Sequence, residues 1–363
     1  MTLKAAIVGT GAVAHLHAQA LTADPRVDLV AVSNRSGERR EVFADRYGVR
    51  GRYTAHTDLL AQEDLDLVVL CTPPHLHREQ ALDAFAAGAH VLCEKPPALS
   101  LAELDAMQAG ADAAGLALAF AFQQRTGTAA AHVRQLLESG DLGRPLLAQC
   151  QTLWLRDADH FAGEHRGTWD AEGGGTTFSH GIHQMDLLAD LLGDWAEVDA
   201  RLWRVDRDIE TEDVSTATVR FTSGALAVLV SSVLSPRETS ALRIDTELAT
   251  IELEHLHGHR GTDWRITPAR GVDPDRAARW TFPLDDEPSG HAALVRGVVD
   301  ALTTGSPLPA VATHARRPLE LATAVYASAT HGRPVTPATL RDDDRFQHSL
   351  RADVVDARPP AVP

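Results

Sequence analysis

A glycine-rich turn near the start of the chain is the first segment whose residues could do chemistry. A strand-like run, Leu3–Val8, leads directly into Gly9-Thr10-Gly11-Ala12-Val13-Ala14, and a helical pattern follows. The first glycine permits a tight turn, the second lets the backbone approach a pyrophosphate, and the small third residue allows close packing of helix and strand. A tight turn without a ligand is the alternative. The position on the first strand of a strand–helix repeat favours a dinucleotide site.

The residues expected to meet the ribose follow about 20 positions later, at the end of the second strand. They read Ser33-Asn34-Arg35-Ser36 and include no acidic residue to accept hydrogen bonds from the ribose hydroxyls of NAD. A guanidinium suits a 2′-phosphate, so the sequence favours NADP over NAD. The alternative is that Arg35 is a solvated loop residue and Asn34 serves NAD.

A polar pair after a later strand could act on a substrate. The run His90–Glu94 ends in Glu94-Lys95 and is followed by two prolines. Because the carboxyl ends of parallel strands open onto the ligand crevice, Lys95 is expected near the nicotinamide. There it could hydrogen-bond a substrate hydroxyl and favour an alkoxide-like state, with Glu94 holding or tuning it. A surface Glu–Lys pair is the alternative.

A third segment combines glycines with histidines. It runs from Gly173 through two further glycines to His183 and Asp186. The glycines are expected to free the backbone near a ligand. On a helix, His183 and Asp186 would share a face because they are three residues apart. Considered without other evidence, such a pair is more often structural than functional.

The first 120 residues alternate strand-like and helical patterns, which predicts a parallel, doubly wound sheet. Most of the strands are short apolar runs, as expected for strands covered on both faces. Ser36 and Ser100 are expected N-caps. The expected strands are Leu3–Val8, Leu29–Ser33, Leu65–Cys71, His90–Glu94 and Leu116–Phe120, and the expected helices are Ala14–Thr22, Ser36–Tyr47, His75–Ala87 and Ser100–Ala114.

After about residue 122, one helix (Thr128–Ser139) precedes alternating or β-branched segments, which predict a largely antiparallel sheet. Two helices follow, at about His291–Thr304 and Pro318–Thr330. The expected strands are Leu146–Leu155, Val198–Val205, Val214–Phe221, Leu226–Val233, Leu242–Asp245 and Thr250–Leu253.

Several motifs together resemble the Gfo/Idh/MocA family, the glucose–fructose oxidoreductase and inositol dehydrogenase group. The resemblance spans roughly residues 3 to 337. The motifs are GTGAVA at the first turn, CTPPHLH at 71–77, CEKPPALS at 93–100, RGTWDAEGGGTTFSHGIHQMDLL at 166–188 and AVYASATHGRPV at 324–335.

The resemblance implies roles for specific residues. Lys95 would be catalytic, and the Lys95-Pro96 bond, which can adopt the cis form, would help to set its turn. His183 would be the acid/base that exchanges a proton with the substrate hydroxyl, a role that suits an imidazole with its pKa near neutrality. The segment at 72–77 would line the cofactor through Thr72, Pro73, Pro74 and His77.

One departure from the family pattern concerns the proton relay. Inositol dehydrogenase-like members carry an Asp four residues before the catalytic histidine, where this chain has Ser179. Ser179 cannot supply that charge, although the neighbouring His180 could contribute. This puts the relay and an inositol-like substrate in doubt. Arg166 and Trp169 are candidate substrate-pocket residues, with a buried structural Trp169 as the alternative.

Composition narrows the class of protein. The 363 residues suit two domains, and the formal net charge of −16 disfavours nucleic acid and anionic membranes as partners. No apolar run reaches the roughly 18 residues that cross a bilayer, and no export signal is visible. Three cysteines cannot build a disulfide framework, so a cytoplasmic protein is expected.

The prediction is therefore an NAD(P)-dependent oxidoreductase with an α/β fold. A Rossmann domain is expected at 1–122 and a poorly ordered tail at 341–363. Between them, at 123–340, we expect an α+β domain for substrate binding and oligomerisation, with a large, mostly antiparallel open sheet. The family resemblance also implies a homo-oligomer through the C-terminal sheet. The expected cofactor contacts are Gly9, Gly11, Ala12, Val13, Ala14, Ser33, Asn34, Arg35, Thr72, Pro73, Pro74, His77, Glu94 and Lys95, and the expected substrate contacts are Lys95, Arg166, Trp169, Ser179, His180 and His183.

Three other functions stay open. The site could hold NAD(P) tightly and oxidise then re-reduce one substrate, as a hydrolase, lyase or epimerase. It could reduce imines, or the protein could be a non-catalytic NAD(P) sensor. No metal is expected. His255, His257 and His259 could share a strand face as a metal site, but a polar strand end is the favoured interpretation.

Overall fold

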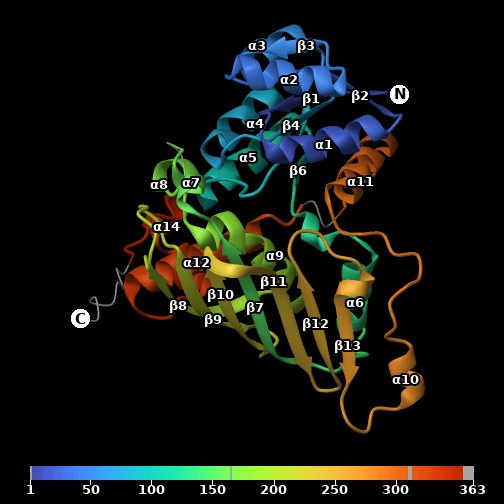
Figure 1. Cartoon of the computed structure of the whole chain (residues 1–363), viewed down its shortest axis with the longest axis vertical. Helices are drawn as coiled ribbons and strands as arrows, with labels where there is room; N and C mark the ends of the chain where they lie inside the picture. Colours follow the sequence, from blue (N-terminus) through green and yellow to red (C-terminus); the bar gives the residue numbers. More distant parts are fainter. Residues whose placement is uncertain (1, 164–165, 310–312, 355–363) are drawn as a thin grey trace. The chain divides into compact units, whose positions relative to one another are not determined.

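The computed structural model describes residues 2–163, 166–309 and 313–354. It consists of two compact units. The first comprises Met1–Gln123 and His291–Ala315, and the second comprises Gln124–Gly290 and Arg316–Pro363. Figure 1 identifies their helices and strands.

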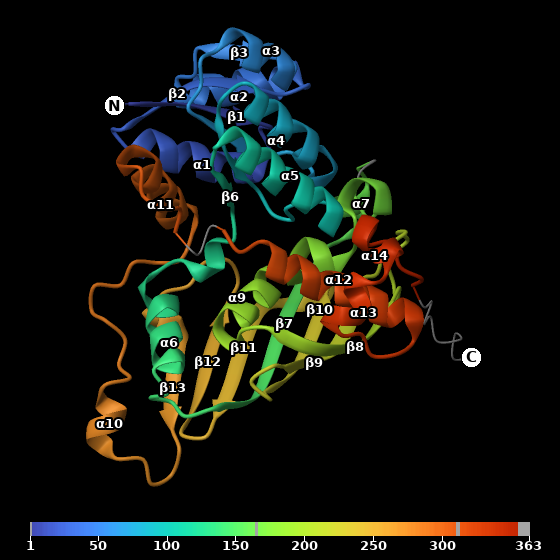
Figure 2. The ribbon, with the colours of Figure 1, turned by 180° about the vertical axis from the view of Figure 1, so that it is seen from behind.

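The first unit is built on a six-stranded parallel sheet of order β3-β2-β1-β4-β5-β6, the doubly wound arrangement that the sequence predicts. Helices α1 and α11 lie side by side over one face, and α4 and α5 cover the other (Figures 1 and 2). The strands are β1 (Leu3–Val8), β2 (Val27–Ser33), β3 (Gly51–Tyr53), β4 (Leu67–Leu70), β5 (His90–Cys93) and β6 (Leu118–Phe120), and the helices are α1 (Ala12–Ala23), α2 (Gly37–Tyr47), α3 (His56–Gln62), α4 (His77–Ala86), α5 (Leu101–Ala114) and α11 (His291–Thr304).

Two features of this unit follow from its side chains. Ser36 and Ser100 cap α2 and α5 by accepting hydrogen bonds from backbone N–H groups, as expected. Helix α11 contributes Leu294, Val295 and Val298 to the same core as β1. This late helix therefore belongs to the first unit by its contacts, whereas the sequence pattern placed it within 123–340.

The second unit contains a seven-stranded sheet of order β13-β12-β11-β7-β10-β9-β8. Only the β7–β10 pair is parallel, which confirms the mostly antiparallel sheet. Helices α9 and α12 cover one face (Figure 2). The strands are β7 (Pro145–Leu155), β8 (Trp195–Trp203), β9 (Val214–Phe221), β10 (Leu226–Ser232), β11 (Leu234–Thr246), β12 (Ala249–His255) and β13 (Trp264–Pro268), and the helices are α6 (Thr128–Glu138), α7 (Ala158–Phe161), α8 (Trp169–Glu172), α9 (Ile182–Leu192), α10 (Pro274–Ala278), α12 (Arg316–His331), α13 (Pro337–Arg341) and α14 (Asp344–His348).

The start of the expected tail is folded. Helix α14 buries Phe346 completely, and Leu350 is also buried. Asp343 caps α14 by accepting from the backbone N–H of Phe346, so an aspartate in this segment serves a helix and not a poorly ordered tail. The proline-rich end from residue 355 onward lies outside the described residues.

Candidate active site

Three segments predicted to meet the cofactor leave the first sheet at one edge. Val8, Leu70 and Cys93 stand in register at the carboxyl ends of β1, β4 and β5. The glycine loop, the segment from Cys71 and the Glu94-Lys95 pair therefore emerge together, at the edge where doubly wound sheets bind ligands.

The two loop glycines do different work. Gly9 has φ +94°, and a Cβ there would lie 2.7 Å from the carbonyl oxygen of Cys71. Gly11 is the N-cap of α1, and a Cβ there would have no atom within 4 Å. Gly11 and Ala12 are exposed, whereas Ala14 is fully buried under the helix. The open N-terminus of α1 can therefore admit a pyrophosphate.

The end of β2 is a braced turn that presents cations. The Asn34 side chain joins this turn to the glycine loop, since its amide donates to the Thr10 hydroxyl and its oxygen accepts from the Ser36 N–H. Arg40 donates to the Asn34 carbonyl at 3.2 Å, and Arg35 is exposed. Sequence reasoning did not single out Thr10 or Arg40.

His77 joins two loops instead of lining an open surface. Its ring is fully buried, with Nε2 2.8 Å from the Thr72 carbonyl and Nδ1 3.0 Å from the Pro96 carbonyl. Burial lowers its pKa. The ring could reach a ligand only by giving up these carbonyls. It therefore supports the segment at 72–74 and the turn at Lys95 from behind.

Glu94 is buried beneath the turn that carries Lys95. One carboxylate oxygen accepts from His17 Nε2 at 2.7 Å and from His291 Nε2 at 3.0 Å, and the other accepts from the Lys95 N–H at 3.1 Å. Burial raises its pKa, but these hydrogen bonds prevail and hold the pKa well below the usual value. Lys95 is half-buried, its bond to Pro96 is cis, and the only other lysine in the chain is Lys4.

In the second unit, the glycine segment is packed against protein. A Cβ on Gly174 would lie 2.3 Å from the Tyr326 hydroxyl oxygen, and one on Gly175 would lie 2.1 Å from the Glu212 carbonyl oxygen. The buried Glu212 carboxylate accepts from the N–H groups of Gly175 and Thr177 and from the Tyr326 hydroxyl. Close packing thus accounts for these glycines, where the sequence suggested a nearby ligand.

A short π-helix, Thr177–Gly181, leads into α9 and presents Ser179 and His180. The Ser179 hydroxyl donates to the Gly175 carbonyl at 2.8 Å and lies 2.6 Å from His180 Nδ1. Because the hydroxyl proton goes to the carbonyl, Nδ1–H of His180 donates to Ser179. The His180 ring also packs edge-on against Trp154. Ser179 thus orients His180, its neighbour in the chain, at the position where the family pattern has an Asp four residues before the expected catalytic histidine.

His183 lies in the first turn of α9 and is buried. Asp186, three residues later, is also buried and lies 2.8 Å from Arg125 Nε. Burial raises the pKa of Asp186 to about 7, against the opposing effect of Arg125. The next residue after His183, Gln184, donates to His255. The sequence missed Arg125, because its partner is distant along the chain.

The two other residues expected in the substrate pocket differ in exposure. Trp169 is buried with its ring edge-on to Tyr326, as in the structural alternative, and Arg166 pairs with Glu172 at 3.0 Å on the surface. His259 accepts from Trp264 Nε1 at Nδ1 and faces the Gln124 carbonyl through Nε2, so both ring nitrogens are used. All three cysteines are free and buried.

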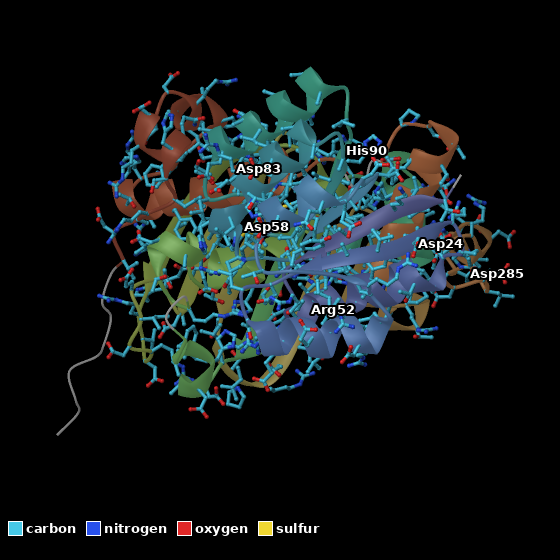
Figure 3. The ribbon with its side chains drawn as sticks, turned by 90° about the horizontal axis from the view of Figure 1, so that it is seen from above. Asp24, Arg52, Asp58, Asp83, His90 and Asp285 are labelled. Atoms are coloured by element: carbon cyan, nitrogen blue, oxygen red, sulfur yellow. The ribbon has the colours of Figure 1, made fainter. Side chains whose placement is uncertain are left out.

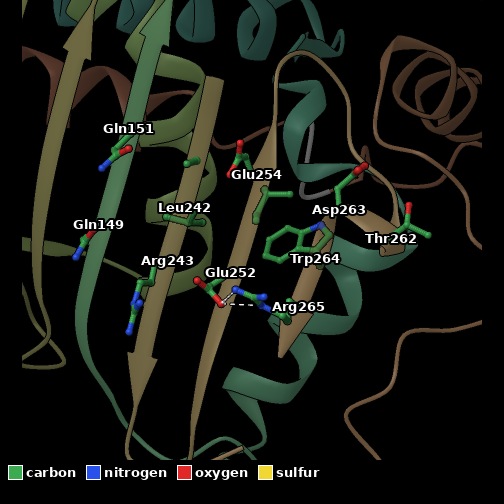
Figure 4. A pocket seen from close by; sticks show the side chains of 12 residues that line it. Gln149, Gln151, Leu242, Arg243, Glu252, Glu254, Thr262, Asp263, Trp264 and Arg265 are labelled. Carbon is green, nitrogen blue, oxygen red and sulfur yellow. Dashed lines mark hydrogen bonds and ion pairs between the residues drawn. The ribbon is translucent and has the colours of Figure 1, made fainter. Parts of the chain in front are cut away.

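A hollow of about 510 Å³ lies on the exposed face of the second sheet, and no predicted site residue lines it (Figure 4). Polar side chains on β7, β11, β12 and β13 line much of it. Arg265 pairs there with Glu252. Among the described residues, no helix is long and apolar enough to span a membrane.

A parallel sheet with a glycine loop at its carboxyl edge and a lysine on the same edge defines a dinucleotide-binding oxidoreductase. Residues 3–122 match the oxidoreductase family with an NAD-binding Rossmann fold, and residues 130–262 match the GFO/IDH/MocA C-terminal domain. The chain belongs to the Gfo/Idh/MocA family of NAD-binding oxidoreductases.

Several of the similar proteins are named for sugar substrates. D-Apiose dehydrogenase of Rhizobium rhizogenes is 26% identical over 92% of this chain and 97% of its own length. 1,5-Anhydro-D-fructose reductase of Ensifer adhaerens is 33% identical over 55% of this chain and 60% of its own. A crystal structure of the WlbA dehydrogenase from Bordetella pertussis with NADH and UDP-GlcNAcA superimposes with a TM-score of 0.82, at 26% identity, over 93% of this chain and 99% of that one.

Proposed function

We propose that the enzyme interconverts a secondary alcohol and a ketone on a sugar, polyol or related small molecule, with Lys95 and His183 as its catalytic residues. The nicotinamide, when bound, supplies the redox chemistry by accepting or giving a hydride. The observation that carries the proposal is the position of Lys95, which lies two residues after β5 on the sheet edge that also holds the glycine loop. The sugar-acting relatives support the substrate class.

Each catalytic residue has one task. The Lys95 ammonium donates a hydrogen bond to the substrate oxygen and stabilises negative charge as it develops there. His183 takes the hydroxyl proton during oxidation and returns it during reduction. His180, oriented by Ser179, is proposed as a substrate contact.

NADP is the proposed cofactor. The Asn34 side chain is already hydrogen-bonded to Thr10 and Ser36, the segment at 33–36 has no acidic residue, and Arg35 is exposed there. Arg40, on α2, donates to the Asn34 carbonyl and also pairs with Glu41, so Arg35 is the proposed contact of the 2′-phosphate. A guanidinium there favours a 2′-phosphate. The glycine loop, the segment at 72–74 and the turn at Glu94 are the proposed remaining contacts.

We also propose that the enzyme forms a homo-oligomer through the uncovered face of its second sheet. Large apolar side chains on β7 and β10 are exposed there, in neighbouring strands. They are Leu147, Leu155, Leu226 and Val228. A cytoplasmic location is proposed as well, in keeping with three free cysteines.

The test combines cofactor binding with turnover. NADPH and NADH are titrated into the wild type, Arg35→Ala, Lys95→Met and His183→Asn while nicotinamide fluorescence is followed. Turnover is then measured with D-apiose, myo-inositol and 1,5-anhydro-D-fructose. We expect Arg35→Ala to weaken NADPH alone, and the other two variants to lose roughly 100-fold or more in kcat. Unchanged turnover in both would refute the proposed mechanism, and tighter binding of NADH by the wild type would refute the NADP assignment.

A further inference from the structure

The Glu94 carboxylate is held by two histidines that come from distant parts of the chain. His17 lies on α1, the helix that follows the glycine loop, and His291 is the first residue of α11. Both direct Nε2 at the same oxygen of Glu94, and all three side chains are buried. Their rings meet edge-on with centroids 4.8 Å apart. The arrangement therefore ties two helices to the end of β5.

The hydrogen-bonding pattern assigns the protons. Glu94 Oε1 can only accept while it is ionised, so both histidines donate from Nε2–H. His17 Nδ1 is buried and has no hydrogen-bond partner among the described residues, which suits a nitrogen without a proton. A metal ion at Nε2 would require a proton on Nδ1, and metal-bound histidines normally donate that proton to a neighbour. The cluster is thus built as a hydrogen-bonded clamp.

The other oxygen of Glu94 accepts from the backbone N–H of Lys95. We propose that His17 and His291 are positioning residues that fix the Lys95 turn by clamping the Glu94 carboxylate between them. This inference rests on the function proposed above for Lys95. It adds that the helix at the glycine loop and α11 are coupled to the catalytic lysine through one buried anion.

The clamp also explains how an anion persists at this depth. A buried carboxylate without a cation is unstable unless it is fully hydrogen-bonded. Here three N–H donors serve it, and the pKa of Glu94 is lowered. Three other buried groups among the described residues also sense the charge of Glu94: His77, Cys71 and Cys93.

The experiment removes the donors one at a time. His17→Leu and His291→Leu lose the Nε2–H group, whereas His17→Gln and His291→Gln keep an N–H near the same point. His90→Asn is the matched control. His90, labelled in Figure 3, is the first residue of β5, at the end of the strand away from Glu94, and its Nδ1 accepts from the Ala117 N–H. We expect kcat to fall roughly 10- to 100-fold in the leucine variants, less in the glutamine variants and not in the control, because a misplaced catalytic group costs about this much.

A pH profile separates positioning from a merely structural role. With one donor removed, burial of Glu94 is less well opposed and its carboxylate takes up a proton more readily. The kcat of His291→Leu should therefore recover as the pH rises, relative to the wild type. Glu94→Gln and the double variant His291→Leu with Glu94→Gln should lack this recovery. The same pH profile in the single and double variants would overturn the proposal.

A second readout does not depend on turnover. Because the chain has only two lysines, a Lys4→Arg background leaves Lys95 as the only ε-amine to label by ¹³C reductive methylation. We expect the Lys95 resonance to shift in Glu94→Gln and in both leucine variants, and to stay in place in His90→Asn. An unmoved resonance in folded variants, or a stoichiometric metal in the purified wild type, would overturn the clamp. If the resonance shifts but the wild type turns over no sugar, the proposed function fails and the clamp stands.

Discussion

The two glycine-rich segments of this protein look alike in sequence and differ in what surrounds them. In the first unit, a Cβ on Gly11 would stand in open space at the N-terminus of α1. In the second unit, a Cβ on Gly175 would lie 2.1 Å from the carbonyl oxygen of the buried Glu212, and one on Gly174 would lie 2.3 Å from the Tyr326 hydroxyl oxygen. Both distances are too short for a side chain. The first segment therefore leaves open space beside its backbone, whereas in the second segment other residues of the protein occupy that space.

The difference shows that the same residue type serves two purposes. Gly11 leaves open space at its backbone, into which we propose that a pyrophosphate fits. Gly175 leaves room for the carboxylate that accepts its own N–H and that of Thr177, so the turn before α9 is fixed internally. Substitutions at the two positions should therefore separate stability from binding.

The largest effect is expected for Gly175→Ala. The added methyl would meet the Glu212 backbone oxygen at 2.1 Å and its carboxylate at 2.6 Å, and neither can move without breaking buried hydrogen bonds. We expect destabilisation of about 4 kcal/mol or more, at the upper end for overpacked cores. Thermal unfolding followed by circular dichroism measures it. Gly163→Ala is the control, because a Cβ there would have no neighbour within 4 Å in the part of the chain that the structure describes. Equal melting temperatures for the two variants would contradict the comparison.

Gly11→Ala should have the opposite profile. Its φ of −72° suits alanine and the methyl has no protein neighbour, so stability should change by no more than about 1 kcal/mol. Cofactor affinity should fall roughly tenfold or more, about 1.4 kcal/mol, because the methyl occupies the path of the pyrophosphate. Nicotinamide fluorescence measures the change.

Gly9→Ala is the contrasting variant within the same loop. It combines a strained φ of +94° with a clash against the Cys71 carbonyl, so it should lose roughly 2–4 kcal/mol of stability as well as affinity. A Gly11→Ala protein that binds both nicotinamide cofactors as tightly as the wild type would show that the open space serves no ligand.

Much of the fold could be predicted because its signals are local. The buried runs of β1, β4 and β5 read as apolar stretches, and Ser36 and Ser100 mark helix starts. Strand β11 was predicted too short, at Leu242–Asp245, since its first half carries Pro236, Arg237 and Glu238 and lacks an apolar alternation. Local pattern fails where an exposed strand end has polar residues.

The site was predictable only in part, because its supports are distant in sequence. The positions after β1 and β5 follow from strand order, so the glycine loop and Lys95 could be placed at one edge. Nothing in the spacing links Glu94 to His291, 197 residues away, or Gly175 to Glu212. His291 and Glu212 have no feature in the sequence that marks them as partners, because only the folded chain brings them next to the motifs.

The smallest expected effect is a change with pH in the stability that the buried Glu212 contributes to the second glycine segment. Burial raises the pKa of Glu212 above its unfolded value of 4.5, despite the hydrogen bonds that favour the anion. Folding therefore takes up a proton, and the stability this group contributes is present at low pH and lost as the pH rises from about 4.5 through the raised pKa. Glu212→Gln stays neutral at every pH. Its carbonyl oxygen can still accept from the Thr177 N–H and the Tyr326 hydroxyl, whereas its amide nitrogen cannot accept from the Gly175 N–H, a loss of stability that does not change with pH.

The melting temperature of the wild type should thus fall relative to Glu212→Gln as the pH rises above about 4.5, with the glutamine variant as the reference that cannot titrate. The same comparison in the Gly11→Ala background should give an identical pH dependence, because the open loop contributes nothing to the packing around Glu212. A melting-temperature difference that is constant with pH would mean that Glu212 keeps its ordinary pKa in the folded protein. The donors at Gly175, Thr177 and Tyr326 would then offset its burial completely, and the glycines would be packed around an anion as stable as one in water.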